Sequence, residues 1–419
     1  AITLVPINST LNRVMIFDIG ISKTLFTLLA IFPYLLSPIQ VAIGSFSDRN
    51  PIFGYRRSPY ILAGLILCVL GVAVSPQIAL LMSENLTFGI IVGIFAFGMW
   101  GMGYNLSAVC YLSLASELSG KDGRGKTIAT MFTIMVIGLI ATGLSLSRMV
   151  PTYVPEVLNR AFLIVAASAL TLGLLGLFKL ESPASISSST AKADTYTVRE
   201  MTSAITENRV AKIFFVYLLL LLAAILGQDV LLEPFGAQAF GMTLEQTSRI
   251  VSITYSFTLI AFIMAGFLDG RIKKKYVAQM GNLSALIGFL TIVVSGFTAS
   301  LTTFYVGITL LGLGTGLSTI ANLSLMFDLT VPEKVGLYIG AWGFSNGLSR
   351  LVGLLMAGLV ADLATNLTGN ALSGYLIVFG LEALMLFVAA IMLYRIDVDS
   401  FQKKAHDPSF VDKVAVVAD

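Results

Sequence analysis

The sequence predicts an all-α membrane protein with twelve transmembrane helices in two pseudo-symmetric bundles of six. Of its 419 residues, 56% are hydrophobic and only 12% are charged, whereas soluble domains carry about 25% charged residues. This composition excludes a water-soluble enzyme and a disordered protein. A transmembrane helix needs about 20 apolar residues. A span together with its loop takes about 35 residues, so the length of this chain accommodates about twelve spans.

Twelve apolar runs follow one another along the chain, and most are of spanning length. They cover approximately residues 1–18, 23–46, 59–82, 87–116, 127–149, 160–179, 210–232, 247–268, 276–298, 301–327, 336–361 and 372–394. The first run is short and contains Arg13. A Ser-rich stretch after the sixth run is typical of a flexible linker. We therefore expect an N-terminal bundle over 1–181, a linker over 182–208, a C-terminal bundle over 209–396 and a tail over 397–419.

Lys and Arg are distributed unevenly between the two sides that this topology creates. The loops after the even-numbered runs, together with the linker and the tail, carry 20 of the 26 Lys and Arg residues. The positive-inside rule assigns that side to the cytoplasm. We therefore expect both chain ends to be cytoplasmic.

The fourth and tenth runs repeat the same residues at one fixed offset of 211 positions. The matched pairs include Gly101 and Gly312, Gly103 and Gly314, Leu106 and Leu317, and Ser107 and Ser318. Parallel repeats of six spans with both ends cytoplasmic are the pattern of the major facilitator superfamily. The repeat therefore predicts that fold.

The loop after the second run resembles the loop motif of that superfamily, in which Gly-x-x-x-Asp-Arg is followed by a glycine and paired arginines. A degenerate copy follows the eighth run. The carboxylates of both copies can accept hydrogen bonds from a helix N-terminus or pair with basic residues. This arrangement predicts a cytoplasmic gate. The alternative is that the cations only follow the positive-inside rule. The candidate gating residues are Asp48, Arg49, Gly54, Arg56, Arg57, Glu117, Asp269, Arg271 and Asp328.

We expect two specific pairings in this gate. Glu117 ends the fourth run and should lie near Arg56 or Arg57. Asp328 ends the tenth run and should lie near Arg271 or its lysine neighbours.

Two charges fall in the middle of apolar runs, where they are costly in lipid. Arg350 is in the eleventh run and Glu382 in the twelfth, so an intramembrane ion pair is expected, with either a functional or a structural role. The only histidine, His406, is in the polar tail, and Cys68 and Cys110 fall in separate apolar runs. We therefore expect neither a metal site nor an enzyme.

Three strings resemble the PucC/LhaA group, the bacteriochlorophyll delivery family of the major facilitator superfamily. They are Asn12-Arg13-Val-Met-Ile16, Arg56-Arg57-Ser-Pro-Tyr-Ile61 and Gln228-Asp-Val-Leu-Leu-Glu-Pro-Phe-Gly236. The third is the most specific, because it is not part of the general facilitator pattern. The resemblance extends from Leu11 to about Arg395.

This resemblance implies a chlorophyll-binding or delivery protein that assists assembly of light-harvesting or photosystem complexes. The membrane would be photosynthetic, either thylakoid or intracytoplasmic. The loop sequence resembles the cyanobacterial branch of the family more than the purple bacterial branch. The cyanobacterial branch implies chlorophyll a, whereas a purple bacterium would imply bacteriochlorophyll. The partners would be pigment, lipids and photosystem or light-harvesting subunits, and not nucleic acid.

The magnesium of such a pigment takes an axial oxygen or nitrogen ligand, and no histidine falls in a span. An amide, a carboxylate, a backbone carbonyl or water must then serve, and Arg13 could offset a carboxylate charge. For any single asparagine, a helix–helix hydrogen bond is the alternative. Pro234 lacks an N–H and could leave nearby carbonyls free. The candidate pigment-binding residues are Asn12, Arg13, Asp18, Gln228, Asp229, Glu233, Asn105 and Asn322.

Two other functions fit the sequence. The chain could be a secondary transporter of a small solute that works by alternating access, proton-coupled through Asp229, Glu233 or Glu382. It could also be a structural photosystem-associated subunit that has lost transport. A bound pigment at defined stoichiometry would separate the transporter from the two pigment-related functions.

Overall fold

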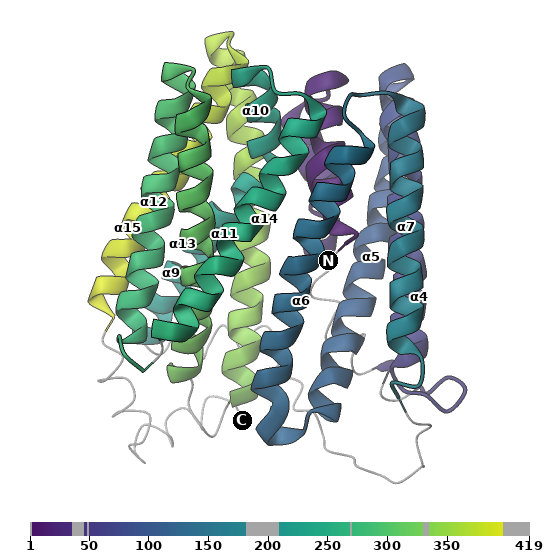
Figure 1. Ribbon diagram of the computed structural model, residues 1–419, viewed down its shortest axis with the longest axis vertical. Helices are drawn as coiled ribbons and strands as arrows, with labels where there is room; N and C mark the ends of the chain where they lie inside the picture. The colour runs from purple at the N-terminus through teal and green to yellow at the C-terminus, as the bar shows by residue number, and fades with distance from the viewer. Residues whose placement is uncertain are drawn as a thin grey trace. The chain divides into compact units, whose positions relative to one another are not determined.

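The computed structural model describes residues 2–35, 46–47, 50–181, 209–268, 270–329 and 335–396. Within these ranges the chain is helical, and its β-structure is limited to an isolated bridge between Ile52 and Tyr55. The helices, labelled in Figure 1 where there is room, are η1 Pro6–Leu11, η2 Val14–Asp18, α1 Lys23–Ala30, α2 Phe32–Leu35, α4 Ser58–Glu84, α5 Leu86–Leu118, α6 Gly120–Met149, α7 Pro155–Leu177, α9 Arg209–Gly227, η3 Gln228–Val230, α10 Leu232–Phe240, α11 Leu244–Leu268, α12 Lys274–Thr298, α13 Leu301–Asp328, α14 Val335–Thr368 and α15 Ala371–Arg395.

Ten helical segments are long and apolar enough to cross a membrane, counted over the described residues. They correspond to the third through twelfth runs of the sequence. The first run does not form a regular α-helix, because η1 and η2 are short π-helices. The second run begins as α1 and α2, and residues 36–45 lie outside the described part of the chain.

The chain divides into two compact units. One comprises Ala1–Ala193 and Asp229–Tyr255, and the other comprises Asp194–Gln228 and Ser256–Asp419. In the first unit α4 packs along α5 and α7; in the second, α12 packs along α13 and α15 (Figure 1). The boundary between the units lies within η3, between Gln228 and Asp229. The helix α10 and the first half of α11 therefore belong to the same unit as the N-terminal helices.

Equivalent glycines set very close helix contacts in both units. A Cβ on Gly103 would lie 2.4 Å from the backbone nitrogen of Cys68, and a Cβ on Gly314 would lie 2.4 Å from that of Ala285. Small residues allow backbones to approach this closely. Because these two glycines are a matched pair of the sequence repeat, the repeat recurs as the same α4–α5 and α12–α13 contact. Cys68 and Cys110 are both buried and are not joined in a disulfide.

Candidate functional site

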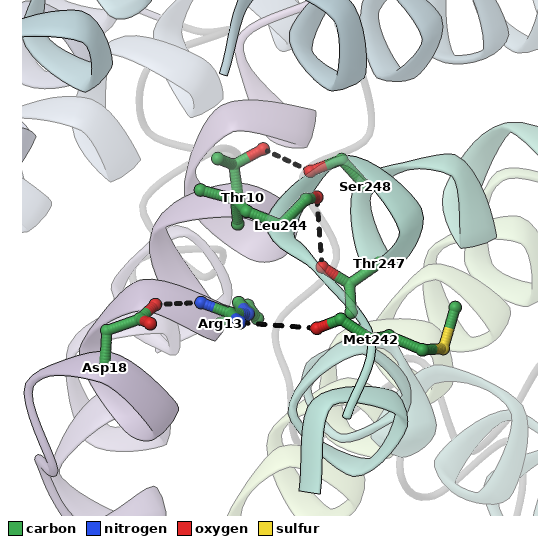
Figure 2. Close-up of polar contacts among 7 residues, drawn as sticks. All are labelled: Thr10, Arg13, Asp18, Met242, Leu244, Thr247 and Ser248. Atoms are coloured by element: carbon green, nitrogen blue, oxygen red, sulfur yellow. Dashed lines mark hydrogen bonds and ion pairs between the residues drawn. The ribbon is translucent and has the colours of Figure 1, made fainter. Parts of the chain in front are cut away.

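Polar side chains of the N-terminal segment and of the chain after α9 meet inside the first unit (Figure 2). The π-helical segment buries Ser9, Thr10 and Asn12 instead of exposing them. The Thr10 hydroxyl lies 3.4 Å from the Ser248 hydroxyl of α11. The unit therefore contains a buried polar cluster at the place where two of the family-like strings converge.

Arg13 is a cation of this cluster, and its side chain is buried. Its guanidinium donates through Nη1 to the Asp18 carboxylate and through Nη2 to the Met242 carbonyl, the latter at 3.5 Å. It also lies over the Phe17 ring, 4.7 Å from the centroid.

The seventh span is broken at this cluster. The expected span over 210–232 is present, but its helix type changes near its end: α9 ends at Gly227, a 3-10 turn follows, and α10 begins at Leu232. In an uninterrupted helix the N–H of residue 234 would donate to the carbonyl of Val230, but Pro234 has no N–H. The Nδ2 of Asn12 donates to that carbonyl instead, at 2.7 Å. The proline therefore frees a carbonyl, and Asn12 satisfies it.

Glu233 is the most deeply buried carboxylic acid of the cluster, with 1% of its surface exposed. Neither of its carboxyl oxygens makes a hydrogen bond of normal geometry. The Ser9 hydroxyl and the charge of Arg13 lie beside this carboxyl group. Asn12 Oδ1 is likewise buried without a hydrogen-bond partner. The site thus presents several unsatisfied oxygens around one carboxyl group.

The other candidate pigment ligands lie outside this cluster or make contacts that favour another role. Asn322 belongs to a buried network of the second unit: its Oδ1 accepts from the Tyr217 hydroxyl at 2.8 Å and its Nδ2 donates to the Ser318 carbonyl at 2.8 Å. Asn282 joins Tyr217 and Ser318 in the same network. These contacts favour a structural role for Asn322. Asn105 is buried in α5, and Gln228 and Asp229 form the 3-10 turn before α10.

The predicted gate is described only in part. Asp48, Arg49, Asp269 and the side chain of Glu117 lie outside the described residues, so the pairing expected for Glu117 stays a prediction. Gly54 adopts φ +80°, which suits a glycine in the turn between the Ile52–Tyr55 bridge residues.

Glu181, which the sequence reasoning missed, organises the beginning of α4. Its carboxylate accepts from the backbone N–H groups of Arg56 at 2.9 Å and Arg57 at 3.2 Å. It also accepts from the N–H and the hydroxyl of Ser58, each at 2.7 Å. Partial burial alone would raise the pKa of Glu181, but these hydrogen bonds outweigh it and hold the pKa below its usual value. The only sequence signal was an acid directly after the sixth run.

The second unit contains the corresponding basic loop and helix end. Lys274 donates to both carboxylate oxygens of Asp328, at 2.8 and 2.9 Å. This is the pairing expected between the end of α13 and a lysine neighbour of Arg271, which itself is exposed. The gating role of the pair stays a prediction.

Glu382 of α15 is fully buried, at 0% exposure, whereas Arg350 of α14 is partly buried. A Cβ on Gly227 would lie 2.9 Å from Glu382 Oε1, so this carboxyl packs directly against the end of α9. A direct pair with Arg350 stays a prediction. Among the described residues, no group of three His, Cys, Asp or Glu side chains is placed to hold a metal ion.

Comparison with known proteins agrees with this architecture. Protein PucC of Rhodobacter capsulatus is 27% identical over 402 residues, covering 92% of this chain and 87% of that protein. The bacteriochlorophyll synthase 44.5 kDa chain of the same species is 23% identical, covering 92% and 89%. Among solved structures, a bacterial homologue of the human lysosomal transporter Spinster superposes with a TM-score of 0.71 at 12% identity, covering 97% of both chains.

These likenesses show two things. The structural likeness establishes an all-α membrane fold of the major facilitator type, as the sequence repeat predicted. The family model described as PUCC protein matches residues 10–401. The chain therefore belongs to the PUCC protein family.

Proposed function

We propose that this chain binds a chlorophyll-type pigment in a photosynthetic membrane and delivers it to light-harvesting or photosystem subunits during their assembly. Two relatives support this proposal through their names, one as PucC and one as a chain of bacteriochlorophyll synthase. The pigment is chlorophyll a in a thylakoid, or bacteriochlorophyll in an intracytoplasmic membrane. Both termini then face the cytoplasm, following the distribution of Lys and Arg.

One observation carries the proposed binding site. The two strings that resemble the pigment-delivery family, around Asn12–Asp18 and around Asp229–Gly236, meet in a buried cluster with unsatisfied oxygens on Asn12 and Glu233. The magnesium of a chlorophyll is a hard cation and takes an oxygen ligand. Buried polar atoms without partners are rare and need an explanation, such as an absent ligand.

The roles of the individual residues follow from their placement. Glu233 or Asn12 would supply an oxygen ligand to the magnesium of the pigment, and Arg13 would compensate the charge of a carboxylate ligand. Asp18 orients Arg13 by accepting its hydrogen bond. We propose binding and delivery, not synthesis, although one relative is named a synthase chain. The buried cluster offers oxygens that can hold a pigment, and Arg13 is the cation beside them.

The test is a pigment measurement on the intact protein. The chain is produced in a cell that makes the pigment, purified in mild detergent and analysed for absorption spectrum and pigment stoichiometry. Substitutions Glu233→Gln, Asn12→Leu and Arg13→Leu are expected to lower the bound pigment. Glu245→Gln is the matched control, because Glu245 belongs to the same unit and is exposed in an ion pair with Arg249 on one helix face.

Two outcomes contradict the proposal in different ways. If all three variants keep the pigment of the parent protein, the binding site lies elsewhere in the chain. If the parent protein carries no pigment but moves a solute across liposomes, the chain is a transporter and the pigment role is wrong.

A further inference from the structure

The loop before α4 contains a tight turn with a phenylalanine at its tip. The backbone N–H of Ile52 donates to the Tyr55 carbonyl at 2.9 Å, and the N–H of Tyr55 donates to the Ile52 carbonyl at 3.0 Å. The two residues between them, Phe53 and Gly54, have φ angles of +52° and +80°. Positive φ at both central residues is the conformation that a type I′ turn requires.

Phenylalanine is unfavourable at this position for two separate reasons. Residues other than glycine rarely adopt positive φ, and Asn-Gly is the pair that this turn prefers. Phe53 is also 93% exposed, the highest fraction among the large hydrophobic residues that the structure describes. Backbone outliers of this kind persist at functional sites, where another interaction offsets their cost. The turn therefore indicates that the ring of Phe53 contacts an apolar phase outside the chain.

Contacts on both sides of the turn hold its base against α4 and α7. The Tyr60 hydroxyl of α4 donates to the Asn50 carbonyl at 2.6 Å. On the other side, the Glu181 carboxylate, which follows α7, accepts from the N–H of Ser58 at 2.7 Å. Figure 1 shows the loop projecting outward beside the lower end of α4. The position of Phe53 is therefore fixed relative to the ends of two helices.

The surroundings of the turn have the composition of a membrane interface. Both α4 and α7 are long and apolar enough to span a membrane, and the turn lies where α4 begins and α7 ends. At that end of α7, Phe178 is 74% exposed, and the ammonium group of Lys179 lies 5.4 Å from its ring centroid. Exposed aromatic rings beside cations at the end of a span are typical of contact with lipid headgroups. A bilayer surface fits better than a partner protein, because it meets every side chain at this depth without a matching shape.

We infer that Phe53 is a membrane anchor, whose ring inserts into the interface of the bilayer and holds the loop before α4 on the membrane surface. Burial of the ring in lipid offsets both its exposure to water and the positive φ of its backbone. Because Glu181 joins the same loop to the end of α7, the anchor sets the depth of two helix ends. The inference concerns lipid contact alone and does not depend on the proposed pigment role.

The position of the ring is measured with Phe53→Trp in the full chain, reconstituted in liposomes. Its fluorescence is taken as the difference from the parent protein, which has two tryptophans. We expect quenching by lipids brominated near the headgroup end of the acyl chains, and little quenching by iodide in the water. The control is Thr152→Trp, because Thr152 is exposed in the loop at the opposite end of α7, where iodide should quench. Quenching of Phe53→Trp by iodide and not by lipid would overturn the inference and point to a partner protein instead.

A second measurement has opposite expected signs for backbone preference and for membrane anchoring. In Phe53→Asn the side chain suits positive φ, so backbone preference alone predicts slower amide hydrogen exchange at Tyr55. Loss of a membrane anchor predicts faster exchange in liposomes, by up to about tenfold. We expect faster exchange in Phe53→Asn and the exchange of the parent protein in Phe53→Trp, after correction for intrinsic rates. Slower or unchanged exchange in Phe53→Asn would show that the ring does not anchor the loop.

Discussion

The side-chain amide of Asn12 donates a hydrogen bond to the backbone carbonyl of Val230 at 2.7 Å. This carbonyl needs an outside donor because Pro234, four residues later, has no N–H to offer. Asn12 also donates to the Asn8 carbonyl one turn earlier in its own segment, at 3.2 Å. One amide thus connects the N-terminal segment to the broken seventh span, inside the first unit.

Replacing Asn12 with leucine should destabilise the protein by about 1–3 kcal/mol, because the buried Val230 carbonyl loses its donor. In a Pro234→Ala background the loss should be smaller, since the substituted alanine can supply a backbone N–H to the same carbonyl. The measurement is a double-mutant cycle of unfolding in detergent. Equal losses in the two backgrounds would show that Asn12 stabilises something other than Val230.

The Glu181 carboxylate should control the order of the loop that precedes α4. Glu181→Gln replaces a charged acceptor of several backbone N–H groups with a neutral one. We expect amide hydrogen exchange at Arg56–Ser58 to become faster in this variant. The matched control is Glu156→Gln, because Glu156 is exposed. Unchanged exchange at these amides would mean that the loop is held by other contacts.

The same contact should depend on pH in a defined direction. The pKa of Glu181 in the folded protein lies below its usual value of 4.5. The stabilisation is therefore fully present above pH 4.5 and is lost as the pH falls through the lower, folded-state pKa. Amide exchange at Arg56–Ser58, corrected for its intrinsic pH dependence, should accelerate only in that acidic range. Acceleration above it would point to another titrating group.

The ion pair between Lys274 and Asp328 is partly exposed, so its loss should cost about 1 kcal/mol or less. Asp328→Asn is therefore expected to leave the unfolding midpoint nearly unchanged. If the pair gates the cytoplasmic side, the variant should still increase labelling of a cysteine introduced near the end of α13. The charge-swapped pair Lys274→Asp with Asp328→Lys should restore the parent labelling. Labelling equal to that of the parent in every variant would contradict a gating role.

The sequence was sufficient to predict the third through twelfth spans and the repeat, because these depend on composition and periodicity. It also singled out the two strings that meet in the buried cluster, because both resemble the pigment-delivery family. It did not predict the π-helical form of the first run. It could not reveal that Val230 needs Asn12 as a donor, or that Glu181 reaches the backbone of Arg56. Those contacts join residues far apart in the chain, and they depend on three-dimensional placement that no local pattern encodes.

The placement of Asn322 illustrates the same limit. In the sequence it is a polar residue in an apolar run and a candidate pigment ligand. In the structure both ends of its amide are engaged, by Tyr217 and by the Ser318 carbonyl. Asn322→Leu should therefore lower stability by about 1–3 kcal/mol and leave the pigment content per folded protein unchanged. Pigment loss without loss of stability would make Asn322 a ligand candidate again.

The matched glycines Gly103 and Gly314 offer a test of the structural repeat. Alanine should lower the stability of the protein at these closely packed positions, but not at glycines that have open space around them. Gly103→Ala and Gly314→Ala each place a methyl group 2.4 Å from a backbone nitrogen of the adjacent helix. Each should cost about 1–3 kcal/mol, because the helices must move apart. At Gly98 and Gly380 a Cβ would meet no atom within 4 Å. There the same change should be neutral or stabilise by about 0.5–1 kcal/mol, since alanine favours the helix. The measurement is the unfolding midpoint of the four variants in detergent. Similar midpoints for all four would show that α4–α5 and α12–α13 do not depend on this close approach.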